Sequence, residues 1–211
     1  MFDIINKEGK RVLFRFLNVK KERSVIIPTD IDELSEYAFS NKDALDVEAI
    51  YIPDHITKIP AHCFQKNKAT YIRISPNVKH IGDGAFYNCP NLWKATVPPD
   101  CKLGTKRWDG TWANSASVFE NCPKHATRFS PWIYGIREKG FVTIMFEANT
   151  DAVLQCKSTN KDWIDLPFYR PNLFVADDSG EKKFYRVVEP NTNPTPRIPG
   201  KWKQVTKIIC L

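Results

Sequence analysis

The sequence predicts a mainly β protein: a short solenoid of stacked repeats, capped by a hairpin and followed by a small all-β domain. A pattern of apolar residues, proline and phenylalanine recurs every 22 to 25 residues in the first half of the chain. Two apolar stretches around a glycine turn precede this pattern, and several strand-like stretches follow it. We therefore expect two domains, residues 1–126 and residues 127–211.

Residues 1–23 are predicted to form the capping hairpin. The stretches "FDII" and "RVLFRFL" flank "NKEGK", in which Gly9 suits a tight turn. The first turn of a solenoid exposes an open end that needs a cover, which gives this hairpin a structural role.

The repeat is most regular in three copies, "VIIPTDIDELSEYAF" (25–39), "IYIPDHITKIPAHCF" (50–64) and "IRISPNVKHIGDGAF" (72–86). A fourth copy begins near Val97 and ends at Phe119, about ten residues later than the spacing of the others requires. The endings "FYNCPNL" (86–92) and "FENCPKH" (119–125) show that this copy closes like the third. The fourth copy therefore carries an insertion.

This pattern resembles the BspA-type leucine-rich repeats over about residues 24–126. The first copy departs from the family in having Lys42 where a cysteine is usual, and the third matches almost throughout, at Ile81, Gly82, Ala85, Phe86, Cys89 and Leu92. The resemblance implies a solenoid that binds proteins. Similar members of the family are often surface or secreted proteins that act in adhesion and host interaction.

The stretch "HIGDGAFYNCP" (80–90) combines Gly-x-Gly with a histidine and a cysteine. A phosphate-binding loop would also need Lys and Ser or Thr after the glycines, and this stretch lacks them. We interpret it as scaffold: Gly82 and Gly84 in a tight turn, Phe86 and Cys89 inside the stack.

The strand of each repeat should expose one face for binding. Alternation places Val25/Ile27, Ile50/Ile52, Ile72/Ile74 and Ala95/Val97 inward. The outward rows are then Ile26, Tyr51, Arg73, Thr96 and Ser24, Ala49, Tyr71, Lys94. We expect Tyr51, Tyr71, Arg73 and Lys94 to contact a partner, because solenoids bind through such faces. The alternative is a solvated sheet face.

The insertion contains "KRWDGTW" (106–112), in which Asp109-Gly110 predicts a two-residue hairpin turn. Its arms carry Arg107, Trp108 and Trp112, which we expect to bind a partner as well, because long insertions in compact repeats often carry function. The alternative is burial of the two tryptophans against the C-terminal half.

Beyond residue 127 the repeat stops. Strands are expected at 140–148, 152–157, 172–177, 182–190 and 204–211, and an extended loop at 190–201, which holds four prolines.

The sequence does not predict an enzyme, a cofactor or a metal site. No HExxH, GxSxG or GxxxxGK[ST] motif occurs, and Cys122-x-x-His125 supplies only two of the four ligands that a structural zinc needs. The six cysteines include no CxxC pair and are expected to be free.

We therefore predict a protein-binding module, in the role of an inhibitor or an adhesin. The alternative is a nucleic-acid-associated protein, since the net charge is +7; against it, residues 30–54 carry eight acids and one lysine. No apolar run is long enough to span a membrane. A cytoplasmic location is expected if Met1 is native, and an extracellular or surface location if the chain was trimmed.

Overall fold

The computed structural model describes residues 1–40, 47–105, 110–111, 115–123, 132–148, 152–166, 173–190, 202–204 and 206–211. The chain divides into two units, Met1–Arg128 and Phe129–Leu211. The first unit is a β-solenoid of about four turns over residues 12–103, and the second consists of antiparallel sheets. The predicted fold class is confirmed.

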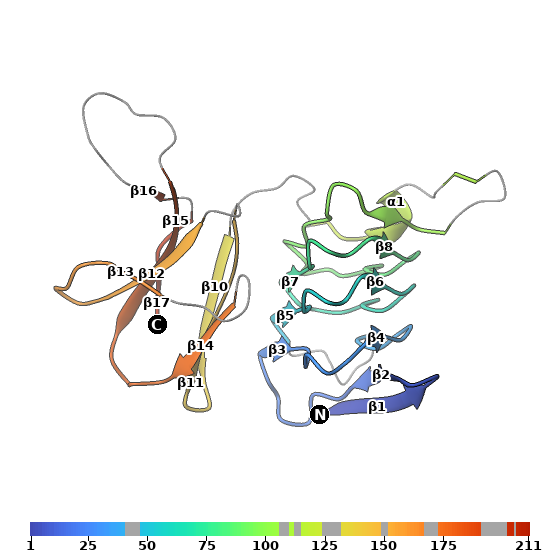
Figure 1. Ribbon diagram of the computed structural model, residues 1–211, viewed down its shortest axis with the longest axis horizontal. Helices are drawn as coiled ribbons and strands as arrows, with labels where there is room; N and C mark the ends of the chain where they lie inside the picture. Colours follow the sequence, from blue (N-terminus) through green and yellow to red (C-terminus); the bar gives the residue numbers. More distant parts are fainter. Residues whose placement is uncertain are drawn as a thin grey trace. The chain divides into compact units, whose positions relative to one another are not determined.

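The hairpin at the start of the chain consists of β1 (Phe2–Lys7) and β2 (Lys10–Phe16). Glu8 and Gly9 form its turn with φ of 52° and 77°, the left-handed conformation of both central residues in a type I′ turn. Figure 1 shows the hairpin at one end of the stack, and β2 pairs in parallel with the first repeat at Leu13 and Leu34. The predicted hairpin cap is confirmed.

The turns of the solenoid contribute short strands to two parallel ladders (Figure 1). The first ladder joins β3 (Ser24–Ile26), β5 (Ala49–Tyr51) and β7 (Tyr71–Arg73). The second joins β6 (Lys58–Ile59), β8 (His80–Ile81) and β9 (Lys102–Leu103), while β4 (Glu33–Leu34) pairs with the hairpin instead. The predicted inward residues are buried, except Val97, which is partly buried and packs against the core.

A column of phenylalanine rings runs through the core along the solenoid axis. It contains Phe16, Phe39, Phe64, Phe86 and Phe119, with ring centroids of successive members 5.0 to 5.4 Å apart. The last member follows the short helix α1 (Ser115–Val118), so the fourth repeat returns to the stack after its insertion. The predicted closure of the fourth repeat is confirmed.

The turns beside these rings require left-handed backbone at fixed positions. The residue two positions before the phenylalanine has φ of 61° at Tyr37, 55° at His62 and 57° at Gly84. Gly82 is needed for another reason, because a Cβ there would lie 2.4 Å from the backbone nitrogen of Ala61. The scaffold interpretation of "HIGDGAFYNCP" is consistent with both constraints.

The second unit contains two antiparallel sheets with a common core. One sheet orders β10 (Trp132–Glu138), β11 (Phe141–Glu147) and β14 (Leu173–Asp177). The other orders β13 (Ile164–Asp165), β12 (Val153–Ser158), β15 (Lys183–Pro190) and β16 (Trp202–Gln204), with β17 (Ile209–Cys210) also paired to β15. Ile144 and Phe146 of the first sheet share a core with Leu154 and Val187 of the second.

The predicted strands 140–148, 152–157, 172–177 and 182–190 correspond to β11, β12, β14 and β15. Among the described residues of the predicted strand 204–211, only Gln204, at the end of β16, and Ile209–Cys210, in β17, lie in strands. The strands β10 and β13 and the first two residues of β16 were not predicted. The loop predicted at 190–201 lies almost entirely outside the described residues.

Candidate functional site

The predicted outward row of the first ladder does not form an exposed surface. The exposed fractions of the side chains of Tyr51, Arg73 and Lys94 are 1%, 1% and 0%, and Tyr71 is half-buried. The expectation that the first three face solvent is therefore wrong, although their predicted role in binding a partner stays a prediction. Strand alternation correctly identifies which side chains point away from the inward row. It does not show whether those side chains are exposed to solvent or covered by their neighbours.

Arg73 is held by contacts within the stack. Its guanidinium lies 4.9 Å from the ring centroid of Tyr51, one rung away on the same face. Its Nη1 donates to the carbonyl of Ile52 at 3.0 Å and forms an ion pair with Asp54. Cation–π and charge-assisted contacts of this kind fix the side chain along the ladder.

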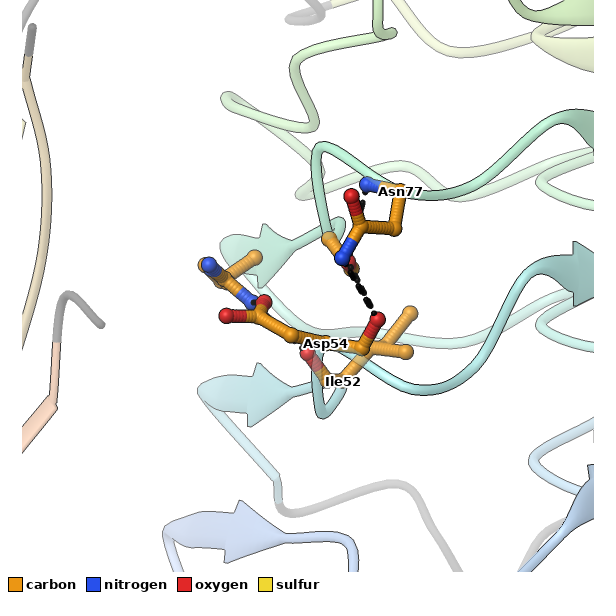
Figure 2. Close-up of polar contacts among 5 residues, drawn as sticks. Ile52, Asp54 and Asn77 are labelled. Atoms are coloured by element: carbon orange, nitrogen blue, oxygen red, sulfur yellow. Dashed lines mark hydrogen bonds and ion pairs between the residues drawn. The ribbon is translucent and has the colours of Figure 1, made fainter. Parts of the chain in front are cut away.

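The turn that follows this ladder is polar. Figure 2 shows the amide of Asn77 reaching the backbone of Asp54, where Nδ2 donates to the carbonyl at 3.0 Å. Ser75 stands where the other repeats have proline, and its Oγ accepts from the Asn77 N–H at 3.0 Å and donates to the Asp54 carbonyl at 3.3 Å. These bonds join consecutive turns of the solenoid and are accounted for by the fold.

The predicted insertion site is not described. Arg107, Trp108 and Trp112 lie outside the described residues, so their role in binding stays a prediction.

The cysteines of the repeat have a structural role. The thiol of Cys89 donates to the carbonyl of Phe64 at 3.1 Å, and that of Cys122 donates to the carbonyl of Phe86 at 2.9 Å. Asn67 occupies the same position in the preceding turn and donates from Nδ2 to the carbonyl of Phe39 at 3.0 Å. The neighbouring Cys122 thiol together with burial raises the pKa of Cys89 far above its usual range, so this thiol remains protonated.

Among the described residues, no three His, Cys, Asp or Glu side chains gather where they could hold a metal ion. His125, the second half of the Cys122-x-x-His125 pair, lies outside them.

A groove lies where the hairpin meets the repeats. Its volume is about 670 Å³, which is within the usual range of a binding pocket. We call it the hairpin groove, and it is lined by residues of β1, β2, β4 and β6 and of the turns beside them: Ile5, Lys7, Lys10, Val12, Phe14, Asp32, Glu33, Leu34, Ser35, Glu36, Ile56, Thr57, Lys58 and Pro60.

A break in the second ladder lies in this groove. The residue after the strand donates its N–H to the preceding turn at Ser35, Gly82 and Gly104, with N···O distances of 2.7 to 2.9 Å. Pro60 occupies that position after β6 and has no N–H. As a result β4 and β6 belong to different sheets, although they occupy the same place in consecutive turns. The groove lies across the gap between these two strands.

The floor of the groove is apolar. Ile5, Val12 and Phe14 lie on one face of the hairpin because strand side chains alternate, and Ile5 is the cross-strand partner of Val12. Val12 is buried, whereas Ile5 and Phe14 are 41% and 46% exposed. Large apolar side chains gathered on a concave surface are a typical feature of an interaction site.

The rim of the groove carries three lysines and three acids, so its charges balance. Lys10 forms an ion pair with Glu33, and this hydrogen bond raises the pKa of Lys10. Asp32 accepts a hydrogen bond from the Arg11 N–H at 2.7 Å. Lys7, Glu36 and Lys58 have no ion-pair partner among the described residues and are available to a ligand.

Comparison with known protein families matches residues 13–110 to the BspA type leucine rich repeat region, in six copies. Residues 13–110 are a BspA-type leucine-rich repeat region. Such repeats are typically protein-binding modules and are usually non-catalytic. The part of the chain after residue 110 matches no family, and no curated protein matches the chain. No helix in the described part of the chain has the length and hydropathy to cross a membrane.

The hairpin groove was not predicted from the sequence. Two signals pointed to it: the apolar alternation of Ile5, Val12 and Phe14, and a proline at a repeat position that elsewhere holds serine or glycine. Their juxtaposition depends on the pairing of β2 with β4, which the sequence pattern does not specify.

Proposed function

We propose that the BspA-type repeat region binds a segment of a protein partner in the hairpin groove and acts through that contact as an inhibitor or an adhesin. The observation that carries the proposal is the exposure of Ile5 and Phe14 over an apolar floor. Each offers apolar surface whose removal from water contributes about 25 cal/mol per Å².

The charges of the rim favour a polypeptide over a polyanion. Three lysines and three acids around an apolar floor suit a segment with an apolar anchor and charged residues of either sign. A nucleic acid would instead meet the carboxylates of Asp32, Glu33 and Glu36 at the same surface. The Trp-bearing insertion remains a predicted second contact.

The proposal is tested by measuring the affinity of a captured partner for matched variants. The double variant Ile5→Ser/Phe14→Ser removes the apolar contact, while Val19→Ser removes an apolar side chain that is 69% exposed and lies outside the groove. We expect the double variant to weaken binding at least tenfold and Val19→Ser to leave the affinity unchanged. Equal affinity of all three proteins would exclude the hairpin groove as the binding site.

A further inference from the structure

The larger sheet of the second unit, which contains β12 and β15 (Figure 1), has one face turned to the core and one turned away from it. The buried side chains of β12 and β15 include Leu154, Cys156, Tyr185 and Val187, which face the core. The opposite face carries the cross-strand pairs Gln155–Arg186 and Lys157–Phe184. We call this face, together with Trp163 and Lys182, the cationic face.

Positive side chains surround aromatic rings on the cationic face. The guanidinium of Arg186 lies 4.1 Å from the ring centroid of Trp163, and Lys157 Nζ lies 5.2 Å from the same centroid. Lys157 and Lys182 lie 6.0 and 5.7 Å from the ring centroid of Phe184. These distances are within the range of cation–π attraction, so the rings hold three cations together at the surface.

A chain of hydrogen bonds links Arg186 to Asp165 through Gln155. Asp165 accepts a hydrogen bond from Gln155 Nε2 at 2.8 Å, and Gln155 Oε1 accepts from Arg186 Nε at 3.0 Å. Within the described residues, none of Lys157, Lys182 and Arg186 forms an ion pair. Gln155 thus orients the guanidinium of Arg186, and partial burial lowers the pKa of Arg186 because desolvation disfavours the cation.

We propose that the cationic face binds the backbone of a single-stranded nucleic acid. Cations interleaved with half-exposed aromatic rings are the combination with which proteins hold single strands: the cations contact phosphates and the rings offer stacking surface to bases. An acidic polypeptide would use the cations but gain little from the rings, so the aromatic residues favour the nucleic acid. This inference does not depend on the function proposed for the hairpin groove, which lies in the other unit.

The test is fluorescence anisotropy of labelled oligo(dT) and oligo(U), each about 15 nucleotides long, titrated with the full chain over a range of salt concentrations. Lys157→Gln/Arg186→Gln removes two charges from the face, and Lys68→Gln/Lys79→Gln removes two exposed charges from the repeat region. Each phosphate contact in a single strand contributes about 0.7 to the slope of log K against log salt. We expect the first variant to lower the slope by about 1.4 and the second to leave it unchanged.

Trp163→Leu changes no charge and tests the aromatic part of the surface. We expect it to weaken binding about tenfold, since stacking of one base contributes on the order of a tenfold change in affinity or more. A lowered Tm would show that Trp163→Leu is destabilised. In that case the test uses Lys157→Gln/Lys182→Gln, which leaves both rings in place, and the proposal then requires this variant to lower the salt slope.

Three results would overturn the proposal. The first is no binding of either oligonucleotide at low salt. The second is an equal loss of affinity in the two charge variants, because bulk charge would then account for binding. The third is competition by polyglutamate as effective as by unlabelled oligonucleotide, together with wild-type affinity of Trp163→Leu, which would identify an acidic protein as the partner.

Discussion

The rings of Phe64 and Phe86 lie parallel, with 5.2 Å between their centroids and 2° between their planes. The two residues end successive repeats 22 positions apart, so each turn of the chain returns one ring to the same place in the stack. The backbone follows the same repeat, since the N–H of Phe64 donates to the carbonyl of Ala85 at 2.8 Å and the N–H of Phe86 to that of Val118 at 3.0 Å. The ring column and the hydrogen bonds therefore stabilise the same stacking.

Replacing Phe64 by alanine should cost about 3–5 kcal/mol of unfolding free energy, because it opens a cavity in the middle of the column. Denaturation of the full chain in urea measures this loss. Phe14→Ala is the matched control: its ring is 46% exposed, so we expect a loss below about 1 kcal/mol. Similar losses for the two variants would show that the column does not stabilise the solenoid.

Two glycines should respond differently to alanine because they are needed for different reasons. A Cβ at Gly82 would lie 2.4 Å from the nitrogen of Ala61, so Gly82→Ala must separate two turns and should cost about 2–3 kcal/mol. Gly9 has φ of 77° and open space around it, so Gly9→Ala should cost only about 1 kcal/mol of backbone strain. Calorimetric unfolding of both variants measures the two losses of stability. A larger loss for Gly9→Ala than for Gly82→Ala would contradict the prediction.

Cys89 is predicted to be replaceable by a hydrogen-bond donor but not by alanine. Cys89→Ala removes the thiol donor from the carbonyl of Phe64, which still accepts from the Asn67 N–H at 3.0 Å, so the expected loss is that of one hydrogen bond, about 0.5–1.5 kcal/mol. Cys89→Ser keeps a donor at the same place and should lose less. Urea unfolding of the two variants measures the difference, and equal stability would show that the hydrogen bond has no role.

Asp83 should make the stability of the repeat region depend on pH in the acid range. Its carboxylate accepts hydrogen bonds from Thr105 Oγ1 and from Ser117 Oγ, the latter at 3.1 Å, and these bonds lower the pKa of Asp83. The stabilisation is therefore present above the pKa of the unfolded chain, about 3.9, and is lost as the pH falls through the lower pKa of the folded protein.

Asp83→Asn should accordingly lower the Tm at pH 7, with a loss of about 1 kcal/mol, and the difference from the wild type should shrink below about pH 4. Asp100→Asn, at an exposed turn, is the control for the change of net charge. A difference in Tm that stays constant down to pH 2 would contradict the assignment.

The core of the first unit could be predicted from the sequence because its signal is repeated. Ile27, Ile52 and Ile74 occur at one position of three copies, and a buried position in one turn of a solenoid is buried in the next. The hairpin was predictable for a local reason, since Gly9 marks a turn between two apolar strands.

The binding surface could not be predicted in the same way. Alternation correctly placed Tyr51 and Arg73 on the face opposite the inward row. It could not predict that both side chains are buried, because their burial depends on contacts such as the cation–π pair between them. The hairpin groove depends on the absence of an N–H at Pro60 and on the pairing of Leu13 with Leu34. The proline can be recognised by aligning the repeats, whereas the pairing of Leu13 with Leu34 is a tertiary contact that the sequence pattern does not specify.

The most direct test of the account is site-specific photo-crosslinking in cells that produce the protein, with the crosslinking amino acid at position 14 or at position 19. Phe14 lies in the hairpin groove, and Val19 is an exposed apolar residue outside it. A protein that binds in the groove should crosslink to position 14 as one discrete adduct and not to position 19. The absence of an adduct at position 14, or the same adduct at both positions, would contradict the account.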